Sequence, residues 1–87
     1  MIVKTNMPTT IDTYWDKFLN GDKFAFEQIY RSLVPQLYEY GMRHYKDETL
    51  VRDAIQDVFV KFWESRAKLK NITSPKHYLL VAMKKRP

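Results

Sequence analysis

The sequence contains no cysteine and few residues that interrupt helices. Its 87 residues include only 2 glycines and 4 prolines. Without cysteine the chain can form no disulfide framework, thiolate metal site or thiolate nucleophile, which is typical of a protein in a reducing cytoplasm. The scarcity of glycine, with no alternating run of β-branched residues, leaves little from which to build hairpins. We therefore predict an all-α fold, a small bundle of three to four helices.

Long apolar segments are also missing. No apolar run approaches the roughly 18 residues of a membrane span, and the N-terminus lacks the hydrophobic stretch of a signal peptide. A chain of this length is expected to form one compact domain whose single core is only marginally stabilising. The sequence thus predicts a soluble, cytoplasmic domain without a membrane span.

Residue sets that carry catalysis or bind cofactors are sparse. His44 and His77 belong to no closely spaced ligand set, so both are expected at the surface rather than on a metal. No glycine-rich loop is available to hold a phosphate, and no Ser/His/Asp set can be proposed from spacing. Trp15 and Trp63 stand at helical spacing and are expected in the core. We predict no enzymatic activity, no metal, no cofactor and no small-molecule substrate.

Apolar periodicity predicts two helices in the first half of the chain. The first starts at Thr10 or Asp12 and runs to Asn20, where Gly21 can adopt the left-handed conformation that ends many helices. The second follows directly, and its pattern of apolar residues continues over about six turns to residues 44–46.

Proline and capping residues define the rest of the chain. Pro35 interrupts the second helical pattern, so a kink or a break is expected there, with helix continuing beyond it. Asp47 is a plausible N-cap for a third helix that ends at residues 67–69. Ser74 as N-cap and Pro75 at the first helical position then predict a short last helix.

Charge is distributed unevenly along the chain. The net charge is +5, but residues 66–87 carry +7 with no acidic side chain, whereas residues 1–65 carry −2. This segregation favours two surfaces with different tasks, the basic one suited to a polyanion such as nucleic acid or an anionic membrane. The apolar face of the basic segment is too small for binding to a membrane surface, so no membrane partner is expected. A solubilising tail is the alternative interpretation of the basic segment.

The segment DAIQDVFVKFWE, residues 53–64, combines an apolar helix face with an acidic one. Opposite its apolar positions, helical spacing gathers a row that we call the acidic stripe: Asp53, Gln56, Asp57, Val60 and Glu64. Asp53 and Asp57 are like charges one turn apart, an arrangement that costs a helix about 0.2–0.5 kcal/mol. The stripe is therefore either a solvated face or a docking surface.

Three stretches together resemble the second conserved region of the bacterial sigma-70 family, in its extracytoplasmic-function (ECF) group. They are NGDKFAFEQIYRSLVPQLYEYGMRHYKD, DAIQDVFVKFWE and NITSPKHYLLVAMKK, in the family's order and spacing. The resemblance implies a sigma region 2 domain over residues 12–87, preceded by a flexible lead-in over residues 1–11. The family's C-terminal helix-turn-helix domain, region 4, is absent, so we expect a truncated chain.

The resemblance implies two binding surfaces. In this family the helix that carries DAIQD docks on the clamp coiled coil of the largest catalytic subunit of RNA polymerase, which assigns the acidic stripe to polymerase binding. The following loop and last helix recognise and open the promoter −10 element while it is partly single-stranded. Carried over by position, the DNA-binding candidates are Lys70, Asn71, Thr73, Ser74, Lys76, His77, Tyr78, Lys84, Lys85 and Arg86. An anti-sigma factor is a further candidate partner.

Physical chemistry supports this division of the basic segment. Lysine and arginine contact phosphates without reading sequence, whereas a short polar loop can hydrogen-bond one base that is turned out of the stack. Tyr78 either stacks on an unpaired base or belongs to the core, and Ile72 is expected to anchor the loop.

Two other functions are compatible with these residues. Residues 75–87 could serve as a recognition helix for double-stranded DNA, although the tight turn between two short helices is missing. A protein-interaction bundle without a DNA role, such as a remnant that binds an anti-sigma factor, is the other. Binding to polymerase distinguishes this bundle from the sigma interpretation.

Overall fold

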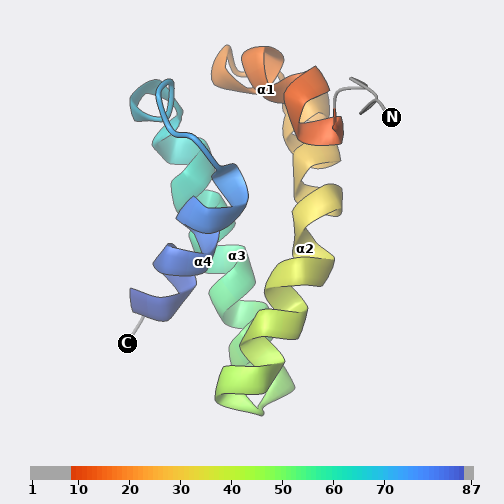
Figure 1. Ribbon diagram of the computed structural model, residues 1–87, viewed down its shortest axis with the longest axis vertical. Helices are drawn as coiled ribbons and strands as arrows, with labels where there is room; N and C mark the ends of the chain where they lie inside the picture. Colours follow the sequence, from red (N-terminus) through yellow and green to blue (C-terminus); the bar gives the residue numbers. More distant parts are fainter. Residues whose placement is uncertain (1–8, 86–87) are drawn as a thin grey trace, which may run out of the picture.

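The computed structural model describes residues 9–85, and the elements in this range are helices only (Figure 1). In chain order they are α1 (Thr10–Leu19), α2 (Lys23–Tyr45), α3 (Glu48–Glu64), the 3₁₀ helix η1 (Arg66–Lys68) and α4 (Pro75–Lys85). Helix α1 lies across one end of α2, α3 returns alongside α2, and α4 packs on both α2 and α3. The predicted all-α bundle is confirmed.

Helix α1 begins at the earlier of its two predicted starts because a capping box forms there. The backbone N–H of Asp12 donates to Thr9 Oγ1 at 3.0 Å, and the N–H of Thr9 donates to the Asp12 carboxylate at 3.3 Å. Residues 10 and 11, which the predicted lead-in includes, are therefore helical. Gly21 ends the segment with φ +91°, as predicted. The expected flexibility of residues 1–8 lies outside the described residues.

Helix α2 runs through Pro35 without a break. Its ribbon changes direction near the middle of the helix (Figure 1), in line with the kink expected of an internal proline. Pro35 itself is exposed, whereas Ile29, Leu33 and Leu37 on the opposite side are buried. Proline has no N–H to donate to the backbone carbonyl four residues before it, and on this exposed side of the helix water can reach that carbonyl instead.

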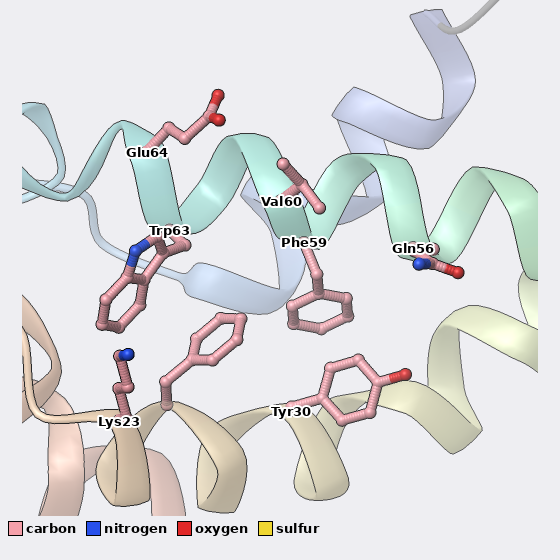
Figure 2. Close-up of a pocket in the computed structure, with 8 residues that line it drawn as sticks. Lys23, Tyr30, Gln56, Phe59, Val60, Trp63 and Glu64 are labelled. Atoms are coloured by element: carbon pink, nitrogen blue, oxygen red, sulfur yellow. The ribbon is translucent and has the colours of Figure 1, made fainter.

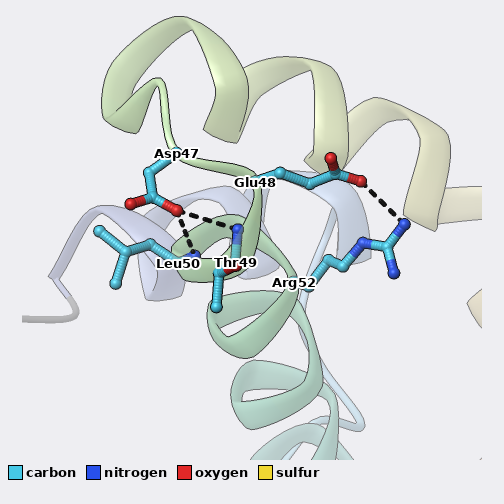
Figure 3. A network of polar contacts seen from close by, with 5 residues as sticks. All are labelled: Asp47, Glu48, Thr49, Leu50 and Arg52. Carbon is cyan, nitrogen blue, oxygen red and sulfur yellow. Dashed lines mark hydrogen bonds and ion pairs between the residues drawn. The ribbon is translucent and has the colours of Figure 1, made fainter.

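Helix α3 begins as predicted, with Asp47 as its N-cap (Figure 3). The backbone N–H groups of Thr49 and Leu50 donate to Asp47 Oδ1 at 3.0 and 3.3 Å. In the first turn, Glu48 pairs with Arg52 at 2.8 Å across one turn of exposed helix surface. Because only Lys46 and Asp47 separate the two helices, the start of α3 lies next to the end of α2.

The predicted end of α3 at residues 67–69 is wrong. The α-helix stops at Glu64, and η1 follows in a tighter winding. The Arg66 guanidinium lies over the Trp63 ring at 3.9 Å from its centroid. It also donates to the Trp63 carbonyl at 3.0 Å, which gives a hydrogen-bond partner to one of the carbonyls at the end of the helix. The tighter winding turns Leu69 into the core, where it is 2% exposed.

The predicted start of α4 is confirmed. The backbone N–H of His77 donates to Ser74 Oγ at 3.1 Å, and Pro75 occupies the first helical position. Leu79 and Met83 are fully buried and attach the helix to the bundle. This attachment fixes the position of the basic segment relative to α3.

The core is rich in aromatic rings. Phe18 of α1 and Phe62 of α3 are both fully buried and stack at 4.9 Å between ring centroids. Trp15 and Trp63, which were expected in the core, are partly buried and pack against its edge. Helices α1 and α3 are thus joined through side chains that are 44 residues apart in sequence.

Gly41 marks a close approach between helices. A Cβ atom at this position would lie 2.8 Å from Val51 Cγ1 and 3.2 Å from Met83 Cε, so α2, α3 and α4 converge here. We expect Gly41→Ala to lower the free energy of unfolding by about 1–2 kcal/mol. An approach of 2.8 Å sets overpacking in the upper part of its usual range, about 2–3 kcal/mol, and the better helix propensity of alanine offsets about 1 kcal/mol of it. Urea unfolding measures this change, and an unchanged transition would contradict the close packing.

Candidate functional site

The acidic stripe lies on the face of α3 that points away from the core. Asp53, Gln56 and Glu64 are exposed, and Asp57 is partly buried. Val60 is 48% exposed, an apolar side chain set among three carboxylates. The opposite face consists of buried residues: Val51, Ala54, Ile55, Val58, Phe59 and Phe62. The predicted acidic surface is confirmed as a surface, and its binding role stays a prediction.

The outer face of α3 extends further toward its N-terminus than the sequence analysis proposed. Leu50 is 54% exposed and stands three residues before Asp53, which makes the two side chains neighbours on the helix. The spacing itself is visible in the sequence, because a residue three positions before Asp53 continues the row of the acidic stripe along the helix. Its exposure could be known only from the packing of α3 against the other helices.

A groove that the sequence analysis did not anticipate opens between α2 and α3 (Figure 2). Its volume is about 540 Å³, and its lining is mainly aromatic and apolar: Phe26, Tyr30, Phe59, Val60 and Trp63, with Lys23, Gln56 and Glu64 as its polar residues. Three of these residues, Gln56, Val60 and Glu64, also belong to the acidic stripe. We call this cavity the aromatic groove.

The loop before α4 and the outer face of α4 form a second hollow of about 570 Å³. It brings together half of the DNA-binding candidates, with three apolar neighbours: Thr73, Ser74, His77, Tyr78 and Lys85, with Ile72, Val81 and Ala82. Ile72 packs against the core, as expected of an anchor for the loop. Tyr78 is 37% exposed and lies 6.0 Å from Phe62, so it belongs partly to the core and partly to the hollow.

The remaining DNA-binding candidates lie outside this hollow. Lys70 lines a separate cleft of about 460 Å³ beside α1, together with Trp15 and Arg66. Asn71, Lys76 and Lys84 are exposed. Arg86 falls outside the described residues. The structure thus gathers the candidates from the loop and α4 into one region, but it does not unite all of them in one pocket.

The acidic and basic surfaces adjoin each other. A groove of about 560 Å³ between α3 and α4 is lined by Asp57, Lys61 and Glu64 on one side and by Tyr78 and Lys85 on the other. The sequence predicts both surfaces but does not place them side by side. A partner on the outer face of α3 and a partner on α4 would therefore lie close together.

Comparison with known families supports the relationship inferred from the sequence motifs. The family described as Sigma-70 region 2 matches residues 29–86 of this chain. These residues include most of α2 and all of α3, the loop and α4. No curated protein and no solved structure gives a significant match. Within residues 9–85, no helix is long and apolar enough to cross a membrane. The chain therefore belongs to the family of sigma-70 region 2 domains, through which sigma factors bind RNA polymerase and melt promoter DNA.

Proposed function

We propose that the protein is region 2 of an ECF-type sigma factor of the bacterial cytoplasm. Its acidic stripe docks on the clamp coiled coil of the largest polymerase subunit, while the loop over residues 70–74 and α4 recognise and open the promoter −10 element. The observation that carries this proposal is the position of the stripe on the outer face of α3, next to the basic face of α4. An anti-sigma factor that covers either surface is a further proposed partner.

The polymerase half of the proposal rests on the charge of the stripe. Asp53, Asp57 and Glu64 place three carboxylates along one face of a helix whose other face is buried. Their mutual repulsion is unfavourable in the free protein and becomes favourable opposite basic side chains. Such complementarity raises the rate of association and fixes the orientation of the partner.

The DNA half rests on the chemistry of the hollow beside α4. Ser74 Oγ accepts the N–H of His77, which leaves its own O–H free to donate to a base. Tyr78 offers a half-exposed ring on which an unstacked base can lie. Lys85 stands at the same hollow and suits a backbone phosphate. Together these groups can hold one nucleotide that has left the duplex.

Binding to the isolated clamp coiled coil of bacterial RNA polymerase tests the proposal directly. We expect the wild-type chain to bind it, with an affinity that falls between low and physiological salt because exposed charges are screened. Circular dichroism should accompany the titration to verify the helix content. Absence of binding at low salt would overturn the proposal and favour the protein-interaction bundle.

The DNA role makes a separate prediction for Lys85. Lys85→Gln should weaken binding of a single-stranded oligonucleotide that carries the −10 element, because one phosphate contact is lost. The slope of log K against log salt should decrease in magnitude by about 0.7, the value for one phosphate on a single strand. Fluorescence anisotropy over a salt series measures this slope. Lys46→Gln on the turn between α2 and α3 is a matched control that should leave it unchanged.

A further inference from the structure

The aromatic groove presents apolar surface beside a charged one. At one end of the groove, the ring of Tyr30 from α2 meets the ring of Phe59 from α3 edge-to-face, with 4.7 Å between their centroids. Further along, Phe26 and Trp63 meet at 5.1 Å. These contacts pack the aromatic rings of α2 and α3 against one another along the groove.

The groove is open to solvent although its lining is apolar. Tyr30 is 37% exposed and Val60 is 48% exposed, while Phe59 is almost fully buried below them. Its volume of about 540 Å³ lies in the range of sites that receive a ligand. Apolar surface gathered in one concave place and flanked by polar residues is typical of an interaction site.

The occupant follows from the residues that the groove shares with the acidic stripe. Gln56, Val60 and Glu64 belong to both, so a partner that docks on the stripe must also cover the mouth of the groove. The carboxylates of the stripe select a basic partner. A groove between two helices accepts a third helix, whose apolar side chains enter it at spacings of three or four residues.

We propose that the polymerase helix that docks on the acidic stripe inserts an apolar side chain into the aromatic groove as its anchor. This inference rests on the proposed function, since it specifies how the same partner is held. The stripe then steers and orients the partner, while the anchor in the groove adds affinity through the apolar surface that it buries. Anchors of this kind are fully desolvated at the centre of an interface and surrounded by polar contacts that exclude water.

Tyr30 tests the groove from outside the stripe, because it belongs to α2. Tyr30→Ala should weaken binding of the clamp coiled coil by about tenfold, the effect typical of a residue at an interface hot spot. Tyr30→Phe retains the ring and should bind like the wild type. Phe24→Ala is the matched control, because Phe24 is 59% exposed on the same helix and does not line the groove. Circular dichroism verifies that each variant is folded.

A second measurement reports on the groove without any substitution in it. The chain has two indole N–H groups, and their NMR signals can be assigned with Trp15→Phe. Trp63 lines the groove, whereas Trp15 of α1 does not line it and instead lines the cleft that contains Arg66 and Lys70. Addition of the coiled coil should shift the Trp63 signal and leave the Trp15 signal in place.

The outcomes separate this inference from the proposed function. If the wild type binds and Tyr30→Ala binds equally well while the Trp63 signal stays in place, the anchor is overturned and the docking role stands. If the wild type does not bind at all, both are overturned. A Trp63 signal that moves with protein concentration before any partner is added would assign the groove to a second copy of this chain and overturn the anchor.

Discussion

Replacing Asp53 by lysine is expected to weaken the complex with the clamp coiled coil by about 10- to 100-fold, because like charges then face each other across the interface. Asp53 is exposed, and within the described part of the chain its carboxylate makes no hydrogen bond or ion pair. The substitution therefore removes no contact that holds the fold together. It also relieves the repulsion between Asp53 and Asp57, so the free domain should be as stable as the wild type or slightly more so.

Isothermal titration at low and physiological salt measures the effect of Asp53→Lys. Asp16→Lys is a suitable control, since it makes the same change of charge at an exposed position on α1, away from the acidic stripe. Both variants raise the net charge equally, so any difference between them reports the position of the charge rather than its amount. Equal affinities for the two variants would remove the stripe from the proposed interface.

Phe62→Ala is expected to lower the free energy of unfolding by about 3–5 kcal/mol. The ring of Phe62 is fully buried. Its centroid lies 4.9 Å from that of Phe18, 5.9 Å from that of Phe59 and 6.0 Å from that of Tyr78. Its loss leaves a cavity where α1, α3 and α4 meet, and rigid neighbours cannot fill it. Because a domain of this length has only about 4–13 kcal/mol of stability, the variant should be partly or largely unfolded at 37 °C.

Thermal and urea unfolding followed by circular dichroism tests this expectation. Phe24→Ala provides the control with the same change of side chain at a position that is 59% exposed, where the loss should be within about 0.5–1 kcal/mol. A Phe62→Ala protein that unfolds at the same urea concentration as the Phe24→Ala protein would show that the aromatic core contributes less than its burial indicates.

The adjoining surfaces on α3 and α4 bear on how the domain would work. Tyr78 and Lys85 line both the hollow beside the loop and the groove between α3 and α4. Asp57 and Glu64 face that same groove from the other side. A polymerase helix on the acidic stripe and a DNA strand on α4 would therefore approach each other within one side of the bundle, which favours a single assembled complex over two independent ones.

Several features of the fold followed from local signals in the sequence. The capping residues Asp47 and Ser74 predicted the starts of α3 and α4 because a side-chain oxygen satisfies backbone N–H groups within the next few residues. Gly21 predicted the end of α1 because its missing Cβ permits a positive φ. The periodicity of residues 53–64 predicted which face of α3 is buried, since 3.6 residues per turn assigns each side chain to a face.

The end of α3 could not be predicted in the same way. Periodicity extends through residues 65–69, but the burial of Leu69 in the core favours the tighter turn of η1. This choice depends on contacts with the core, which lie beyond the range of a helical pattern. The same limit applies to Gly41. The sequence does not show that Val51 and Met83 lie where a Cβ atom of residue 41 would be, so the need for glycine there appears only in the packed structure.

Tertiary structure alone decided where the candidate sites are and how they relate. The aromatic groove exists because Tyr30 of α2 and Phe59 of α3 are brought within 4.7 Å, although 29 residues separate them in sequence. The neighbourhood of the acidic and basic surfaces likewise depends on how α4 packs against α3. Helical periodicity and capping act within one or two turns, so they specify elements and faces. A cavity needs side chains from different elements at contact distance, and only the packed chain provides them.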